Sequence, residues 1–171
     1  MSQDGDGYFL FVFAIGILGL LVGNILFWGN KKDAFSARLL AGFIFSISII
    51  SINFGLQAST FFLNFPHLWR CAGFVGFCGP VFSYLYVKSL LFPSKKIKPI
   101  YFFLFLPSLV YTIILIPLYS LPASEKLIII KQLLADKTLI TLETDVALPN
   151  GWGVMARVLF GLIMSIGQYV L

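Results

Sequence analysis

Few residues in this 171-residue chain could take part in catalysis. The single histidine, His67, lies in the stretch FPHLWR at residues 65–70, and its neighbours do not form the ligand set of a metal site. We expect His67 to lie with Trp69 in an interfacial aromatic belt. No carboxylate lies inside the long apolar runs, and no residue near their serines suits the role of a base. The sequence therefore predicts no catalytic residue, no metal site and no cofactor, and a protein that is not an enzyme.

The two cysteines, Cys71 and Cys78, lie seven residues apart on one predicted helix. A helical rise of about 1.5 Å per residue separates their α-carbons by roughly 10 Å. This distance is too long for a mutual disulfide. We expect both to be small, buried, apolar residues.

Four amide side chains lie within the apolar runs: Asn24, Asn53, Gln57 and Gln168. Such groups are costly in lipid unless they are paired, so we expect all four to face the interior of a helix bundle. They would form interhelical hydrogen bonds, each worth about 0.6 kcal/mol. The alternative function for them is to line a small-molecule pocket or to sense a lipid. Arg157, near one end of its run, is expected to extend its charge to the membrane surface.

The stretch GPVFSYLYVKSLL, residues 79–91, combines several unusual features. Gly79 and Pro80 lie near the middle of an apolar run, where the missing N–H of proline predicts a helix kink or switch point. Tyr84 and Tyr86 follow towards the end of the run, where aromatic residues gather at the membrane interface. Lys88 can extend to the same membrane surface, so these three residues are predicted interfacial anchors.

The composition indicates the class of protein that these residues belong to. Hydrophobic residues make up 59% of the chain and charged residues only 11%, whereas soluble domains carry about 25% charge. The sequence therefore predicts an all-α fold, a polytopic transmembrane bundle in contact with the lipid bilayer. Runs of about 20 apolar residues place five spans at residues 8–28, 39–62, 71–92, 99–119 and 152–171.

The basic residues predict the orientation of these spans. The loops after the first and third spans, with the residues next to them, hold seven of the 12 lysines and arginines, and the other side holds six of the seven acids. Because basic loops stay in the cytoplasm, we expect the N-terminus to lie outside the cell membrane. The net charge of +5 is then explained by topology and does not imply nucleic-acid contact. The outer loop, residues 120–151, is predicted to contain an amphipathic interfacial helix and to be the main exposed segment.

The order of motifs from about residue 65 to 127 resembles a known family. The stretch GPVFSYLYVKSL is followed by a lysine-rich turn, by FLFLPSL at 103–109, by IPLYS at 116–120 and by SEKL at 124–127. This order resembles the N-terminal membrane region of bacterial AraC-type transcriptional regulators, which are common in Bacteroidetes. The resemblance implies a one-component sensor and anchor in a bacterial inner membrane, so that the outer N-terminus would lie in the periplasm. It also implies a cytoplasmic helix-turn-helix domain that binds promoter DNA. That C-terminal domain is absent from this chain, so we expect the chain to be an N-terminal fragment.

In this interpretation, a signal ligand of unspecified chemistry would shift the helices. The shift would bias homodimerisation or the placement of the DNA-binding domain. Two alternatives stay open: a fragment of a polytopic transporter or channel, and the membrane sensor module of a histidine kinase. A transporter fragment predicts charged residues at mid-membrane or an internal repeat, and the sequence has neither.

Overall fold

The computed structural model describes residues 3–29, 34–57, 60–93, 98–135 and 151–170. Its regular secondary structure is entirely helical in these ranges, with no strand among them. The predicted all-α fold is therefore confirmed. Two of the described helices contain segments long and apolar enough to cross a membrane, Phe9–Gly29 and Ala34–Gln57.

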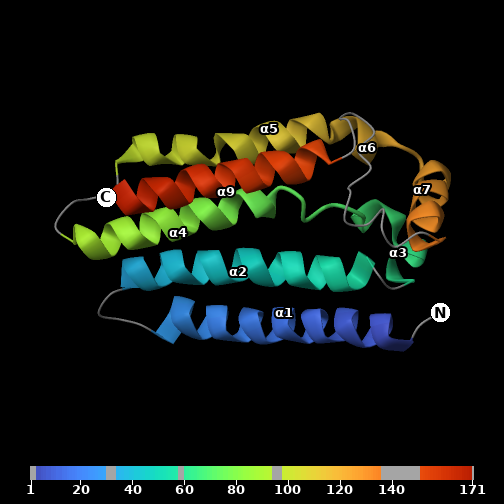
Figure 1. The fold of residues 1–171 in the computed structure, drawn as a ribbon, viewed down its shortest axis with the longest axis horizontal. Helices are drawn as coiled ribbons and strands as arrows, with labels where there is room; N and C mark the ends of the chain where they lie inside the picture. Colours follow the sequence, from blue (N-terminus) through green and yellow to red (C-terminus); the bar gives the residue numbers. More distant parts are fainter. Residues whose placement is uncertain (1–2, 30–33, 58–59, 94–97, 136–150, 171) are drawn as a thin grey trace.

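The first two helices, α1 (Gln3–Gly29) and α2 (Ala34–Gln57), form an antiparallel pair (Figure 1). Glycines allow this pair to pack closely. A methyl group on Gly16 would meet the Ser48 carbonyl oxygen at 2.9 Å, and one on Gly23 would meet the Phe45 ring at 2.6 Å. Gly19 also faces Ser48. Small residues at these positions therefore allow the two helix backbones to approach each other closely.

Two predicted boundaries were wrong: the end of the second span at residue 62 and the start of the third span at residue 71. The second span does not continue to residue 62, because α2 ends at Gln57 and a separate short helix, α3 (Phe61–Asn64), follows. A 3-10 helix, η1 (Pro66–Leu68), and a series of turns then lead to α4 (Val75–Leu91). Arg70, whose φ of 64° is in the left-handed region, breaks any helical path between η1 and α4.

The fourth predicted span, 99–119, is not one α-helix. It consists of the 3-10 helix η2 (Pro99–Phe105), α5 (Leu106–Ile114) and α6 (Ile116–Ser120). Each of these pieces has a proline in its first two positions, where the missing N–H needs no partner. Proline therefore divides an apolar run that a hydropathy window treats as continuous.

The helix predicted in the outer loop is present as α7 (Ala123–Ala135), which packs on η1 and α3. The rest of that loop, 136–150, is outside the described residues. The last helix, α9 (Trp152–Val170), agrees with the fifth predicted span and packs on α4.

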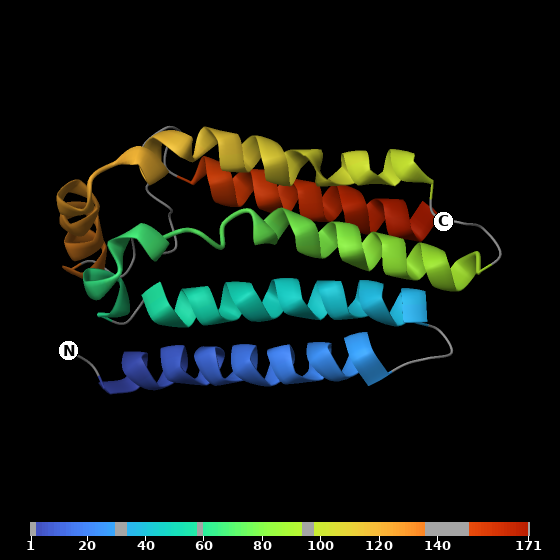
Figure 2. The same ribbon diagram turned by 180° about the vertical axis from the view of Figure 1, so that it is seen from behind.

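The long elements lie roughly parallel in the order α1, α2, α4, α9 and η2–α5–α6 (Figures 1 and 2). The N-terminus, α3 and α7 lie at one end, called the α7 end, and the C-terminus lies at the opposite end. A buried cluster around Phe62, Trp69, Tyr111 and Leu118 supports the α7 end. A second cluster around Val81, Leu85 and Met164 joins α4 to α9 nearer the other end.

Candidate functional site: a polar cavity between the helices

The strongest candidate site is a cavity of about 400 Å³ between α2, the segment before α4, α5 and α9. All four elements contribute from the part that lies towards the α7 end (Figure 1). Its volume is within the range of about 300–1,000 Å³ that is typical of small-molecule sites. Polar and small residues that line it include Asn53, Gln57, Arg70, Gly76, Tyr111 and Arg157.

Asn53 and Gln57 lie one turn apart on the face of α2 that borders this cavity. The Gln57 Nε2 group donates a hydrogen bond of 2.8 Å to Asn53 Oδ1. The predicted interhelical bonds of these two residues were therefore wrong, because a partner one turn away in the same helix satisfies them. An amide has two donor protons and an acceptor oxygen, so this pair can still donate to or accept from a guest molecule.

Arg70 lies at the second side of the cavity in a strained conformation. Its side chain is buried, and its φ of 64° is uncommon for a residue with a Cβ. Its carbonyl oxygen accepts a hydrogen bond from the Tyr119 hydroxyl at 3.2 Å and another from the Gly73 N–H at 3.0 Å. The guanidinium lies 5.1 Å above the centre of the Trp69 ring. These contacts hold the strained backbone in place beside the cavity.

Arg157 lines the cavity from α9. A methyl group on Gly76 would lie 2.6 Å from Arg157 Cδ, so the arginine stem runs across α4 at a point where only glycine leaves room. The Arg157 guanidinium lies 5.8 Å from the centre of the Tyr111 ring. The sequence predicted that this arginine extends to the membrane surface, whereas the structure places it against Tyr111 and Gly76.

Gly79 and Pro80 lie inside α4, about one turn after Gly76, and neither of them is a lining residue of the cavity. Gly79 is buried, and a methyl group there would meet Ser46 Cβ of α2 at 3.5 Å. Pro80 cannot donate to the carbonyl of Gly76, which an ordinary helix would pair with the residue four positions later. The kink at Pro80 stays a prediction. Gly76, whose carbonyl loses its helical hydrogen bond, borders the cavity.

A second cavity of about 300 Å³ adjoins the first and shares Asn53 and Ala72 with it. Apart from Asn53 and Cys71, its lining consists of apolar residues, among them Ile49, Ile52 and Phe74. Cys71 and Cys78 are both free thiols. Cys71 is exposed, so the expectation that it is buried was wrong: it follows the Arg70 turn outside any helix. Partial desolvation raises the pKa of the Cys71 thiol, against a smaller opposite effect of Lys126.

The predicted anchors Tyr84, Tyr86 and Lys88 lie on α4 towards the end opposite α7. The Lys88 ammonium lies 4.3 Å from the centre of the Tyr101 ring and 5.5 Å from that of Tyr84. Tyr86 packs on the buried cluster around Val81. Lysine and tyrosines thus lie together as a local cation–π group, to which η2 adds a ring that the sequence did not indicate.

The other two predicted amides behave differently from each other. Gln168 of α9 donates a hydrogen bond of 3.1 Å to Ser83 Oγ of α4, as an interhelical contact requires. Asn24 does not face the interior: it is exposed and donates to the Leu20 carbonyl at 2.9 Å. Because a carbonyl of its own helix satisfies its amide, Asn24 needs no partner from another helix.

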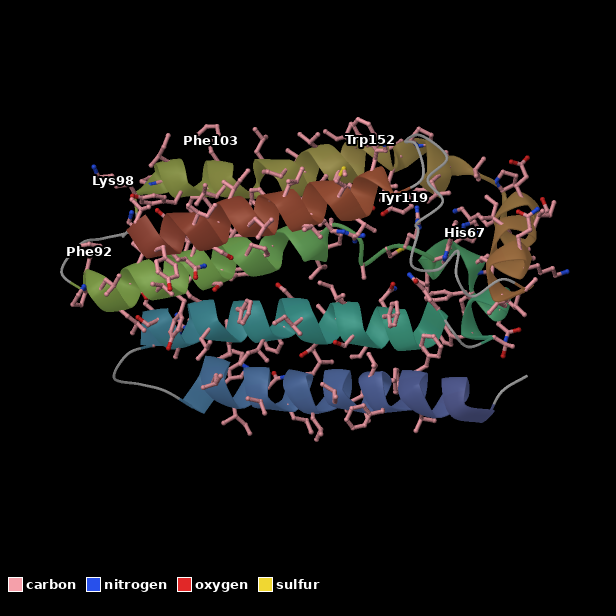
Figure 3. The ribbon with its side chains drawn as sticks, viewed as in Figure 1. His67, Phe92, Lys98, Phe103, Tyr119 and Trp152 are labelled. Atoms are coloured by element: carbon pink, nitrogen blue, oxygen red, sulfur yellow. The ribbon has the colours of Figure 1, made fainter. Side chains whose placement is uncertain are left out.

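His67 and Trp69 do not form the predicted interfacial belt. Trp69 is only 4% exposed and belongs to the core of the α7 end. His67 Nδ1 lies 3.1 Å from the Nζ atom of Lys126, a buried lysine of α7 that also donates to the Tyr119 carbonyl at 2.9 Å. Figure 3 shows His67 and Tyr119 at this end, and Phe92 and Lys98 at the other. No cluster of metal-ligating residues occurs in the described part of the chain.

Sequence reasoning found the two amides of α2 but missed the arginines and the tyrosine opposite them. One signal was present, because an arginine inside an apolar run, such as Arg157, is by default a candidate functional residue. Comparison of the chain with models of known protein families, with characterised proteins and with solved structures finds no match.

Proposed function

We propose that this chain is the membrane-embedded sensor and anchor region of a one-component transcriptional regulator. Its output would be carried by a cytoplasmic DNA-binding domain of the AraC type that follows these helices. The region itself performs no catalysis. In this proposal five elements cross a bacterial inner membrane, with the N-terminus in the periplasm, and the cavity receives the signal.

The arrangement of the elements supports five crossings. The long elements alternate in direction between the two ends of the molecule (Figures 1 and 2). The 17 residues of α4 span about 26 Å, and η2 with α5 spans about 28 Å at 3-10 and α-helical rises. Both lengths approach the bilayer core of about 30 Å. Large apolar side chains, among them Leu10, Ile25, Leu109 and Ile163, are exposed as lipid contact requires.

Charge supports the orientation. Lys88 and Lys98 lie at the end opposite α7, and Arg38 lies in the first turns of α2 at the same end. Placing these residues in the cytoplasm satisfies the rule for basic loops. Residue 170 lies at that end too, so a domain that followed it would be on the side of the DNA.

The observation that carries the proposal is the polar cavity itself. Its two arginines and two amides lie among helices that expose many large apolar side chains. Such groups are costly inside a membrane protein and are typical of ligand sites. The cavity lies near the proposed outer surface, where a signal from outside the cell would arrive.

Labelling of single cysteines tests the orientation. In a cysteine-free background, Asp33→Cys is expected to react only from the cytoplasm and Ile140→Cys only from the periplasm. Labelling of position 140 from the cytoplasm alone would overturn the proposed orientation. The reading frame beyond residue 171 tests the class of protein. A basic helical domain after two further spans supports a regulator, whereas many more spans would favour a transporter.

A promoter reporter tests the role of Pro80 in the full-length protein. We expect Pro80→Ala to restore the helical bond to Gly76 and to change the response to the inducing condition. Pro99→Ala is the matched control, because Pro99 begins η2, where proline costs nothing. Equal induction in both variants and the wild type would exclude Pro80 as a switch point.

A further inference from the structure

We propose that the contact between His67 and Lys126 makes the packing of α7 sensitive to pH, so that acid releases α7 from η1. At neutral pH a neutral imidazole accepts a hydrogen bond from the Lys126 ammonium, and protonation of His67 removes this bond. The biological role rests on the proposed orientation, in which the α7 end faces the outside of the cell. The region would then respond to a second input, the acidity outside, besides a ligand in the cavity.

Lys126 is a charged residue that the fold has buried. Its side chain is only 3% exposed, although α7 lies at one end of the molecule (Figure 1). Its Nζ atom lies 3.1 Å from His67 Nδ1 and donates to the Tyr119 carbonyl at 2.9 Å. A buried ammonium is destabilising unless acceptors replace the water that it has lost. Nδ1 of His67 is therefore one of two acceptors that the described residues give to this ammonium (Figure 3).

The hydrogen bond requires one protonation state of His67. The ammonium has only N–H donors and no acceptor, so Nδ1 must be the unprotonated nitrogen of a neutral imidazole. An imidazolium carries a proton on both nitrogens and cannot accept a hydrogen bond. His67 is itself exposed, so protons reach it from the solvent without any opening of the fold.

Falling pH therefore removes the contact. Histidine side chains change charge between about pH 5 and 8. Protonation of His67 removes an acceptor of Lys126 and places a second cation 3.1 Å from its nitrogen. Separation of the two cations relieves their repulsion and allows water to hydrate the ammonium. Because the state with α7 released binds one more proton, acid favours release and alkali favours packing.

The neighbouring groups on the described elements add no buried negative charge in this range of pH. The Cys71 thiol donates a hydrogen bond of 3.2 Å to the His67 carbonyl, and the Tyr119 hydroxyl donates to the Arg70 carbonyl. Thiols and phenols are neutral below about pH 8, and Arg70 is a further cation. The short helix α3, which also packs on α7, has no titratable side chain. Glu125 is exposed, where solvent and salt screen its charge.

Movement of Lys126 would uncover a buried cluster. Ile130 of α7 is 3% exposed and packs in a cluster with Phe62 and Trp69, beside η1 and α3. Lys126 and Ile130 are four residues apart and therefore lie on the same face of α7. Release of Lys126 from His67 thus moves Ile130 out of its cluster. Ile128 of the same helix is 58% exposed and provides a reference that is already accessible.

The accessibility of cysteines on α7 tests this inference. In a background with Cys71 and Cys78 replaced by serine, Ile130→Cys reports the buried face and Ile128→Cys the exposed face of one helix. Each variant is placed in nanodiscs of neutral phosphatidylcholine and reacted with 2,2′-dithiodipyridine between about pH 5 and 8. The ratio of the two rates removes the effect of pH on the reagent and on thiols in general.

We expect the rate at position 130 relative to position 128 to rise about tenfold or more as the pH falls, because a buried charged group loses a hydrogen bond. His67→Asn provides an amide oxygen as acceptor but does not titrate in this range, so its ratio is expected to stay constant. Lys126→Met keeps the titrating imidazole and removes the buried cation. Its ratio is also expected to stay constant, because His67 then has no ammonium to repel.

The matched control is Lys131→Gln, which removes an exposed cation of the same helix. It is expected to respond to pH as the parent does, and circular dichroism at each pH checks that every variant keeps its helices. A flat ratio in the parent, or a response that persists in His67→Asn or Lys126→Met, would overturn the inference. Because this assay needs neither a DNA-binding output nor a particular orientation, its failure would leave the regulator proposal to be decided by the reporter.

Discussion

The close packing of α1 on α2 predicts that Gly16→Ala destabilises the protein. The added methyl group would lie 2.6 Å from Ile52 Cγ1, 2.9 Å from the Ser48 carbonyl oxygen and 3.0 Å from the Ile52 nitrogen. Two of these atoms belong to the backbone, so a rotamer change cannot remove the clash, and the helices must move apart. The matched control is Gly7→Ala, in the same helix, whose methyl group would meet no atom within 4 Å.

Both substitutions gain helix propensity, about 1 kcal/mol at most, so their difference isolates the packing term. Overpacking costs about 1–3 kcal/mol, and we expect Gly16→Ala to be less stable than Gly7→Ala by that amount. Unfolding by dodecyl sulfate in mixed micelles, followed by circular dichroism, measures the two midpoints. Equal midpoints would refute the α1–α2 interface described here.

The second side of the same interface gives a further check. A methyl group on Gly55 of α2 would lie 2.8 Å from Phe13 Cβ and 3.0 Å from the Phe9 carbonyl oxygen. Once either substitution has separated the helices, the other meets less resistance. The double variant Gly16→Ala with Gly55→Ala is therefore expected to cost less than the sum of the single variants.

Three further predictions use the same unfolding assay. Arg70→Gly is expected to be more stable than Arg70→Ala by about 0.5–1 kcal/mol, since glycine removes a left-handed strain of about 1–2 kcal/mol but loses more chain entropy; equal stabilities would show that the strain is absent. Gln168→Leu and Ser83→Ala are expected to show a coupling energy of about 0.6 kcal/mol in a double-mutant cycle; additive effects would mean that the bond contributes nothing. Lys88→Met is expected to cost about 0.5–1 kcal/mol, and to cost less once Tyr101 is replaced by leucine, because only the Tyr84 contact then remains; an unchanged cost would show that the Tyr101 ring does not stabilise the ammonium.

The sequence predicted best those helices whose apolar runs contain no backbone irregularity. The run from residue 8 to 28 has no charge or proline, and α1 follows it closely. The apolar run at residues 152–171, which forms α9, and the amphipathic pattern of α7 were equally clear. Hydropathy could not show where Arg70 adopts a left-handed conformation, because that conformation depends on the Tyr119 hydroxyl, which is distant in the sequence. Prolines 107 and 117 were visible, but their effect on an apolar run was underestimated.

For a related reason, the sequence predicted only some of the residues that line the candidate site. A spacing of four residues places Asn53 and Gln57 on one helix face, which the sequence shows directly. Arg70, Tyr111 and Arg157 reach the same cavity from three other elements, and only tertiary packing brings them together. The sequence alone gives no reason for a glycine at position 76, because the Arg157 stem that crosses it comes from a distant helix.

Helix α4 connects the two regions that the sequence and the structure single out. Gly76, in its first turn, borders the cavity, and Lys88, in its last turn, lies between two tyrosine rings at the end proposed to be cytoplasmic. A ligand that moved Arg157 would act on Gly76 directly, because the arginine stem lies in contact distance of that residue. The carbonyl of Gly76 lacks the helical bond that Pro80 cannot give, so this turn resists displacement less than the rest of the helix. Any movement passed beyond Pro80 would reach the Lys88 group through a continuous helix, so the Gly-Pro step is the point at which a signal would be either transmitted or lost.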